Sequence, residues 1–129
     1  AALNGRGPVA IGGKSMGGRV ASLVADELLA AGRIDRLVCL GYPFHPPGSP
    51  EKLRTAHLVD MRAPTLICHG ERDPFGTRTE VEAYPLSGAI ALEWLPDGDH
   101  DLKPRKAVTG LTLADNLATA TKRIAAFLA

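Results

Sequence analysis

Short apolar runs alternate with longer amphipathic segments along this chain. The apolar runs cover residues 9–12, 37–41, 65–68 and 89–95. Because each run is apolar at successive positions, we expect both of its faces to be buried, as in a parallel sheet that helices cover on both sides. The alternation of such strands with helices predicts an α/β fold.

The amphipathic segments predict the helices. Apolar residues at every fourth position predict a helix over residues 16–31, which ends at Gly32. A similar stripe predicts a final helix over residues 113–128. A capping-box pattern predicts a short helix over residues 77–84, and another short helix is expected over residues 50–58.

The composition narrows the class of protein. The 129 residues are 45% hydrophobic and 22% charged, which predicts one globular domain over residues 1–129. A net charge of +1 gives no reason to expect a nucleic-acid partner, and no apolar stretch approaches the roughly 20 residues that span a bilayer. The first residues do not resemble a signal peptide. We therefore expect a cytoplasmic protein in which Cys39 and Cys68 are reduced, small hydrophobic residues.

The turn after the first predicted strand contains the pattern G-x-S-x-G, from Gly13 to Gly17. A sharp turn from strand to helix exposes the serine hydroxyl, and small residues on either side let the strand and the helix approach each other. Ser15 is thus a candidate nucleophile. The N–H of Met16, at the start of the helix, is a candidate oxyanion donor.

Two other interpretations of this turn are open. The string from Gly13 to Ser15 matches the end of a phosphate-binding P-loop, but Pro8 occupies the position where that motif needs its first glycine. A glycine-rich turn can also serve structure alone. The rest of the chain has to decide between these interpretations.

A serine nucleophile needs a histidine base, and the base needs a carboxylate. Asp73 follows the third predicted strand and His100 follows the fourth. The resulting order of Ser15, Asp73 and His100 is the order found in α/β-hydrolases. Glu71 is the reserve acid.

Each of these residues also has a simpler interpretation. Asp73 precedes a proline and can be a turn residue only. His100, among Asp97, Asp99 and Asp101, can be a solvated loop residue or part of a weak metal site. The triad is favoured because three required residue types fall in three separate loops, and we expect it to need no metal and no cofactor.

The other candidates are weaker. Lys14 and His45 are expected to line the substrate pocket. His57 precedes the acid, which is the wrong order for the base, and His69 is expected to pack near a strand end or to support the acid.

Four segments, in order, resemble a family of small predicted α/β-hydrolases. They are Gly-Gly-Lys-Ser-Met-Gly-Gly-Arg (12–19), Leu-Gly-Tyr-Pro-Phe-His-Pro-Pro (40–47), Arg-Asp-Pro-Phe-Gly-Thr (72–77) and Asp-Gly-Asp-His-Asp-Leu-Lys-Pro (97–104). The family is similar to dienelactone hydrolases in its compact core and includes a subunit of a chromatin-modifying complex. The resemblance implies that Ser15 is the nucleophile, Asp73 the acid and His100 the base. Dienelactone hydrolases proper use cysteine, so their substrate does not follow.

The resemblance covers only the C-terminal part of an α/β-hydrolase, from the strand before the elbow to the last helix. The N-terminal strands of that fold, and the loop that gives the second oxyanion donor, have no counterpart here. We therefore expect a fragment, or a chain that self-associates through the exposed edge of the first strand.

The expected activity is hydrolysis of an ester or related acyl bond in a small molecule, with no nucleic acid and no membrane as partner. The alternative is a binding or scaffold module with little or no catalysis.

Overall fold

The computed structural model describes residues 8–129 and contains one four-stranded sheet. The strands are β1 (Ala10–Lys14), β2 (Arg36–Leu40), β3 (Thr65–Gly70) and β4 (Ile90–Leu95). They are ordered β1-β2-β3-β4 and every neighbouring pair is parallel. The predicted α/β class and parallel sheet are confirmed, because each apolar run became one strand.

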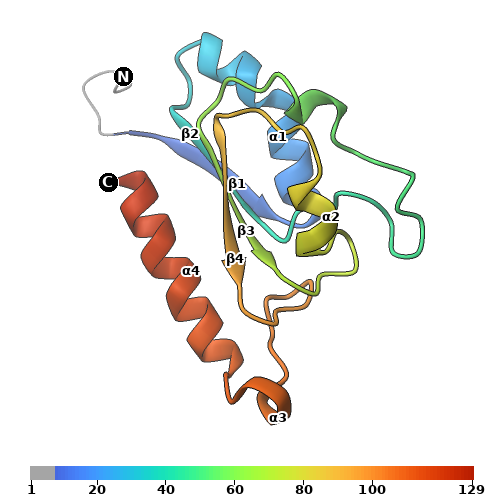
Figure 1. The fold of residues 1–129 in the computed structure, drawn as a ribbon. Helices are drawn as coiled ribbons and strands as arrows, with labels where there is room; N and C mark the ends of the chain where they lie inside the picture. Colours follow the sequence, from blue (N-terminus) through green and yellow to red (C-terminus); the bar gives the residue numbers. More distant parts are fainter. Residues whose placement is uncertain (1–7) are drawn as a thin grey trace.

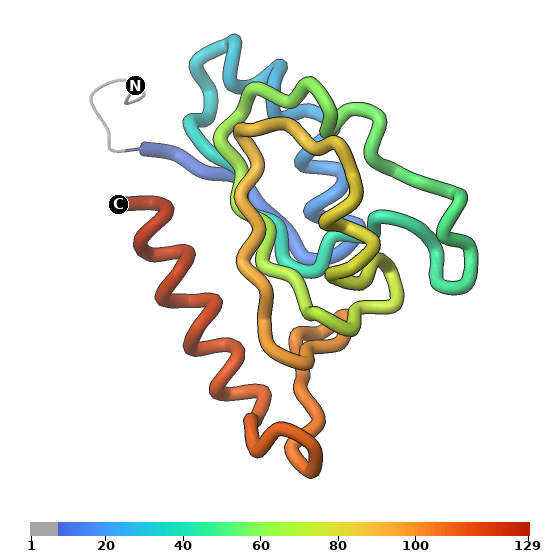
Figure 2. Tube along the Cα trace, viewed as in Figure 1, coloured from blue at the N-terminus to red at the C-terminus, as the bar shows by residue number. Residues whose placement is uncertain are grey.

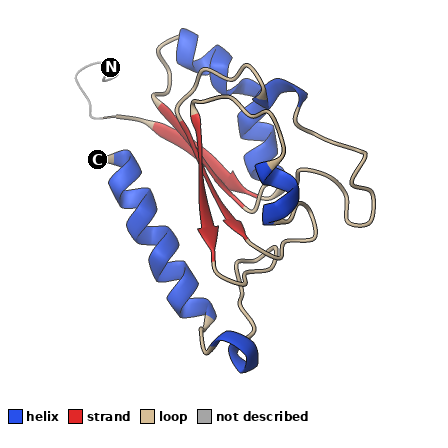
Figure 3. Cartoon of the chain, viewed as in Figure 1, coloured by secondary structure: helices blue, strands red, loops and turns tan. Residues whose placement is uncertain are grey.

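Helices cover the two faces of the sheet (Figure 1). On one side lie α1 (Met16–Ala30) and the short α2 (Arg78–Glu82), and on the other lies α4 (Leu113–Leu128). The short helix α3 (Lys106–Thr109) joins β4 to α4 at the end of the sheet where β4 finishes. Figure 3 shows the strands as the middle layer between these helices.

Alternate residues of the strands supply two separate cores. In β2 and β3, Leu37, Cys39 and Ile67 belong to the core beneath α1 and α2. Leu66 and Cys68, one position along β3, belong to the core beneath α4. Side chains of a strand point alternately to opposite faces, so strands that are apolar at every position can fill both cores.

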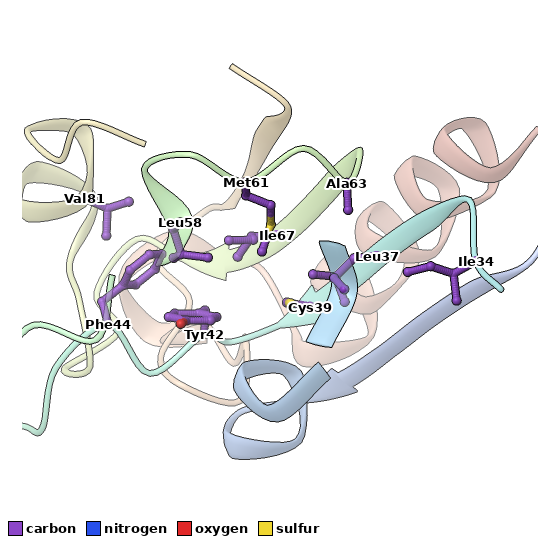
Figure 4. Close-up of a cluster of buried hydrophobic side chains, with 11 residues drawn as sticks. Ile34, Leu37, Cys39, Tyr42, Phe44, Leu58, Met61, Ala63, Ile67 and Val81 are labelled. Carbon is purple, nitrogen blue, oxygen red and sulfur yellow. The ribbon is translucent and has the colours of Figure 1, made fainter. Parts of the chain in front are cut away.

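The larger of the two cores extends beyond the sheet toward the loop that follows β2. Figure 4 shows its side chains, with Tyr42 and Phe44 beside Leu58 and Val81. The rings of Tyr42 and Phe44 lie 4.7 Å apart between centroids. The loop after β2 is thereby held against the sheet by buried aromatic residues.

The helix boundaries agree closely with the sequence pattern. Thr77 caps α2 and forms the predicted capping box with Glu80, and Gly32 follows α1 with φ 70°. The prediction over residues 50–58 was wrong in extent, since only a single 3-10 turn, η1 (Ala56–Leu58), forms there. The chain from β2 to η1 follows a long irregular path (Figure 2), because its prolines cannot donate helical hydrogen bonds.

Most of the apolar stripe of α1 is exposed, while Leu28 packs against the core beneath the helix. The residues of α1 that are buried are small, namely Gly18, Ser22 and Ala25. The large apolar residues of the predicted stripe that are exposed are Met16, Val20, Leu23 and Val24. Small residues at the contact let the helix lie close to β1 and β2. Among residues 8–129, no helix has the length and apolar character that crossing a membrane requires.

Candidate active site

Ser15 lies at the junction of β1 and α1. Its backbone has φ 53° and ψ −122°, a conformation that residues other than glycine rarely adopt. The Ser15 N–H donates to the carbonyl of Leu40, at the end of β2, over 2.8 Å. Met16 is the first residue of α1, so its N–H has no acceptor within the helix.

Two glycines permit this close junction, and only one of them belongs to the predicted pair. A Cβ on Gly13 would lie 2.5 Å from the Gly17 carbonyl carbon, and a Cβ on Gly18 would lie 2.7 Å from the Gly13 oxygen. A Cβ on Gly17 would meet nothing within 4 Å. The contact between strand and helix therefore depends on Gly13 and Gly18, because Gly17 points away from β1.

The loops after β3 and β4 bring Asp73 and His100 to Ser15. Ser15 Oγ lies 2.7 Å from His100 Nε2, and His100 Nδ1 lies 2.8 Å from Asp73 Oδ2. A carboxylate only accepts hydrogen bonds, so Nδ1 carries the proton of this pair and the Nε2 lone pair faces the serine hydroxyl. The three candidate residues thus form one hydrogen-bonded line across three loops.

Asp73 is fully buried and held on both of its oxygens. Its Oδ1 accepts the N–H of Phe75 over 2.8 Å, while Oδ2 faces His100. His69 lies alongside, 3.4 Å from Oδ2. Burial lowers the pKa of His69, so the ring is neutral and donates from Nε2 to the Gly76 carbonyl over 2.7 Å. His69 thus packs against the acid and closes its loop, and no ion pair forms with Asp73.

The loops after β3 and β4 pack directly against each other. A Cβ on Gly70 would collide with the carbonyl oxygens of Gly98 and Asp99. The Arg72 side chain donates from Nε to the Asp97 carbonyl over 2.8 Å. This contact fixes the spacing between Asp73 and His100, because each lies within three residues of it.

The Arg105 guanidinium holds the pKa of Asp97 well below its usual range, and Asp99 accepts the backbone N–H groups of Asp101 and Lys103. Asp101 in turn pairs with Lys14. Each of the three aspartates considered as metal ligands therefore has a protein partner. Glu71, the reserve acid, pairs with Arg78 and accepts the Asp97 N–H.

A surface ion pair joins the residues next to the nucleophile and the base. Lys14 Nζ lies 2.6 Å from Asp101 Oδ1, with the two side chains 59% and 65% exposed. Lys14 lowers the pKa of Asp101. An exposed pair of this kind contributes about 0–1 kcal/mol, so it ties the loop after β4 to the elbow only weakly.

His45, the other expected pocket residue, is only 3% exposed. Its Nδ1 lies 2.8 Å from the Pro46 carbonyl and its Nε2 lies 3.1 Å from Glu80 Oε1. These contacts join the loop after β2 to α2. His57 lies apart from this chemistry, 2.8 Å from Ser22 Oγ on α1.

Sequence reasoning missed two residues that touch His100. The Phe75 ring stacks on the imidazole with centroids 4.2 Å apart. Gly41 has φ 63°, and a Cβ there would lie 2.7 Å from the His100 carbonyl oxygen. Both follow strands, at the same sheet edge as the three candidates, which is the one signal in the sequence that could have singled them out.

Comparison with known proteins gives a family and several similar solved structures. A family model described as alpha/beta hydrolase domain matches residues 1–129. The crystal structure of the esterase domain from a Rhodothermus marinus protein is similar with a TM-score of 0.54 and 18% identity. The match covers 90% of this chain and 60% of that domain. A search of curated proteins found no match.

Proposed function

This chain belongs to the alpha/beta hydrolase domain family, and on that premise we propose that it is a serine hydrolase that cleaves an ester or related acyl bond of a small molecule. The observation that carries the proposal is the line from Ser15 Oγ through His100 to Asp73, with distances of 2.7 Å and 2.8 Å. Hydrogen-bond contact from nucleophile to base, and from base to acid, is what nucleophilic catalysis by serine requires.

Attack begins at the serine. As Ser15 Oγ bonds to the substrate carbonyl carbon, its proton passes to His100 Nε2. The imidazolium that forms donates from Nδ1 to Asp73 Oδ2. The negative charge moves to the carbonyl oxygen, where the Met16 N–H can donate to it. One such donor contributes about 10²–10³ in rate.

Collapse of this intermediate releases the leaving group, which takes the proton from His100 Nε2. Water then attacks the acyl-enzyme as His100 accepts its proton, and the free acid leaves as Ser15 regains its hydrogen. The unusual backbone of Ser15 supports this role, since it presents Oγ to His100 while its N–H stays bonded to β2.

Labelling with a fluorophosphonate probe tests the proposal. Wild type is expected to react with the probe, and Ser15→Ala is expected not to. The rate at which Ser15→Ala hydrolyses a p-nitrophenyl ester should be lower than that of wild type by at least about 10⁴-fold. Ser22→Ala is the matched control, because Ser22 also lies beside a histidine but donates its hydroxyl proton to the Arg19 carbonyl over 2.6 Å. This variant is expected to label as wild type does.

A folded wild-type protein that does not label would contradict the proposal and favour a binding or scaffold module. Circular dichroism of each sample establishes that it is folded. Simple ester reporters are the first substrates to try, because the proposed chemistry transfers an acyl group to Ser15. We also propose the cytoplasm as its compartment, which suits the two buried, free thiols Cys39 and Cys68.

A further inference from the structure

Phe75 lies in the loop between β3 and α2 and covers His100. The two ring centroids are 4.2 Å apart and the ring planes are inclined by 27°, which is a stacked arrangement. The face of a phenyl ring is negative and attracts a cation above it. A neutral imidazole gains little from that attraction, whereas an imidazolium gains more.

The backbone around Phe75 is held on both sides. Its N–H donates to Asp73 Oδ1 over 2.8 Å, and its carbonyl accepts the N–H of His45 over 3.0 Å. The next residue, Gly76, donates its N–H to the Asp73 carbonyl over 3.0 Å and accepts from His69 Nε2. The loop that fixes the acid therefore also fixes the ring that stacks on the base.

Gly41 lies beside the imidazole at another point. A Cβ on Gly41 would lie 3.5 Å from both Nδ1 and Cε1 of His100. The Gly41 N–H donates to the Cys68 carbonyl over 2.9 Å, so this part of the backbone continues the sheet. The side chain of His100 is only 20% exposed. The imidazole is thus largely enclosed by protein.

We propose that Phe75 is a positioning residue for the hydrolase: its ring holds the His100 imidazole between Ser15 and Asp73 and stabilises the positive charge that the ring gains with the Ser15 proton. The inference rests on the proposed function. The charge exists only after proton transfer begins, so the stacking is stronger in the transition state than in the ground state. Such an interaction raises kcat and leaves KM nearly unchanged.

Charged and titratable groups near His100 come from several elements. Asp73 faces it from the loop after β3, and His69 faces it from β3 as a neutral ring. Asp101, from its own loop, is paired with Lys14 of β1. None of these groups changes when Phe75 is replaced, so a shift in pH dependence in a Phe75 variant can be assigned to the ring.

The test compares Phe75→Leu with Phe75→Tyr, which keeps the ring face. In Phe75→Leu we expect kcat for a p-nitrophenyl ester to fall between about twofold and thirtyfold, with KM within about twofold. The acid limb of the rate profile should move to lower pH, because the imidazolium is less stable without the ring. Phe75→Tyr should restore both properties.

Phe127→Leu is the matched control, since Phe127 is a partly buried phenyl group of α4 that packs in the other core. It should change neither kcat nor the pH profile. Equal rates and profiles in wild type and Phe75→Leu would overturn the inference, as would failure of Phe75→Tyr to restore them.

A second measurement does not depend on activity. The His100 ring proton is followed by NMR against pH in wild type and Phe75→Leu, and is assigned by its loss in His100→Gln. The midpoint should be lower in the leucine variant by about half a pH unit to one and a half. An unchanged midpoint would overturn the role of Phe75 even where labelling at Ser15 is intact. A lowered midpoint without labelling would overturn the hydrolase alone.

Discussion

The contacts of the buried His45 ring determine which protonation state of that ring is favoured. Acceptors face both ring nitrogens of His45, the Pro46 carbonyl at Nδ1 and the Glu80 carboxylate at Nε2. Both nitrogens can bond these acceptors only as N–H donors, so the two contacts stabilise the imidazolium form of the ring. Burial by itself would lower the pKa of His45, but the hydrogen bonds to Pro46 and Glu80 outweigh it and the pKa is raised.

This charge predicts a pH dependence of stability. The folded pKa of His45 lies above its ordinary value of 6.5, so the stabilisation is complete below about pH 6.5 and is lost as the pH rises through the folded pKa. Wild type should exceed His45→Gln in unfolding free energy by on the order of 1 kcal/mol at low pH, and the difference should shrink at higher pH. Urea unfolding measured at several pH values checks this.

The control for this prediction is Glu80→Gln, which leaves the Pro46 contact in place. Thr77 and His45 hold the pKa of Glu80 low, and Asp73 is the other carboxylate that acts on His45. Glu80→Gln should make the unfolding free energy less dependent on pH, as His45→Gln does. A difference between wild type and His45→Gln that grows with pH would contradict the imidazolium assignment.

At the scale of elements, the junction of β1 and α1 depends on which glycines contact the backbone of the neighbouring element. Because Gly13 and Gly18 meet backbone and Gly17 meets nothing, the two glycines of the G-x-S-x-G pattern are not equivalent. A side chain at Gly13 must push the helix off the strand, whereas a side chain at Gly17 enters open space.

Alanine substitutions should separate the two positions. Gly13→Ala is expected to lower the unfolding free energy by about 1–3 kcal/mol through overpacking. Gly17→Ala is expected to raise it by up to about 1 kcal/mol, since alanine is the better helix former. Urea unfolding of both variants measures the difference, and equal effects would show that close approach at Gly13 is not what the junction requires.

At the scale of the whole molecule, the parallel sheet assembles the site. All four strands end at the same edge, so Ser15, Gly41, Asp73 and His100 each follow a different strand and still meet there. In open α/β sheets this edge, at the carboxyl ends of the strands, is where ligands bind. The residues are 27 to 85 positions apart in the pairs that bond, and the sheet, together with the contacts between its loops, brings them together.

Self-association through β1 stays a prediction. Within residues 8–129, β1 pairs with β2 only, and its residues Ala10, Gly12 and Lys14 are exposed. Sedimentation velocity over a range of concentrations should reveal a dimer that weakens in Ala10→Lys, because a lysine on an edge strand opposes pairing. A monomer at every concentration, in wild type as in the variant, would refute it.

The sequence by itself determined the features that depend on near neighbours. Apolar runs marked the four strands, and the capping box from Thr77 to Glu80 marked the start of α2. The sequence also predicted the tight turn around Ser15 and the order of the candidate residues, because both follow from local patterns.

Only the tertiary structure decided which distant groups touch. It placed Phe75 on His100 and an acceptor at each nitrogen of His45. It also left most of the large apolar residues of the predicted α1 stripe exposed. Periodicity reports which face of an element is apolar, but it does not report what lies opposite that face. Such contacts join residues of separate elements, and their partners are set by how strands and helices pack.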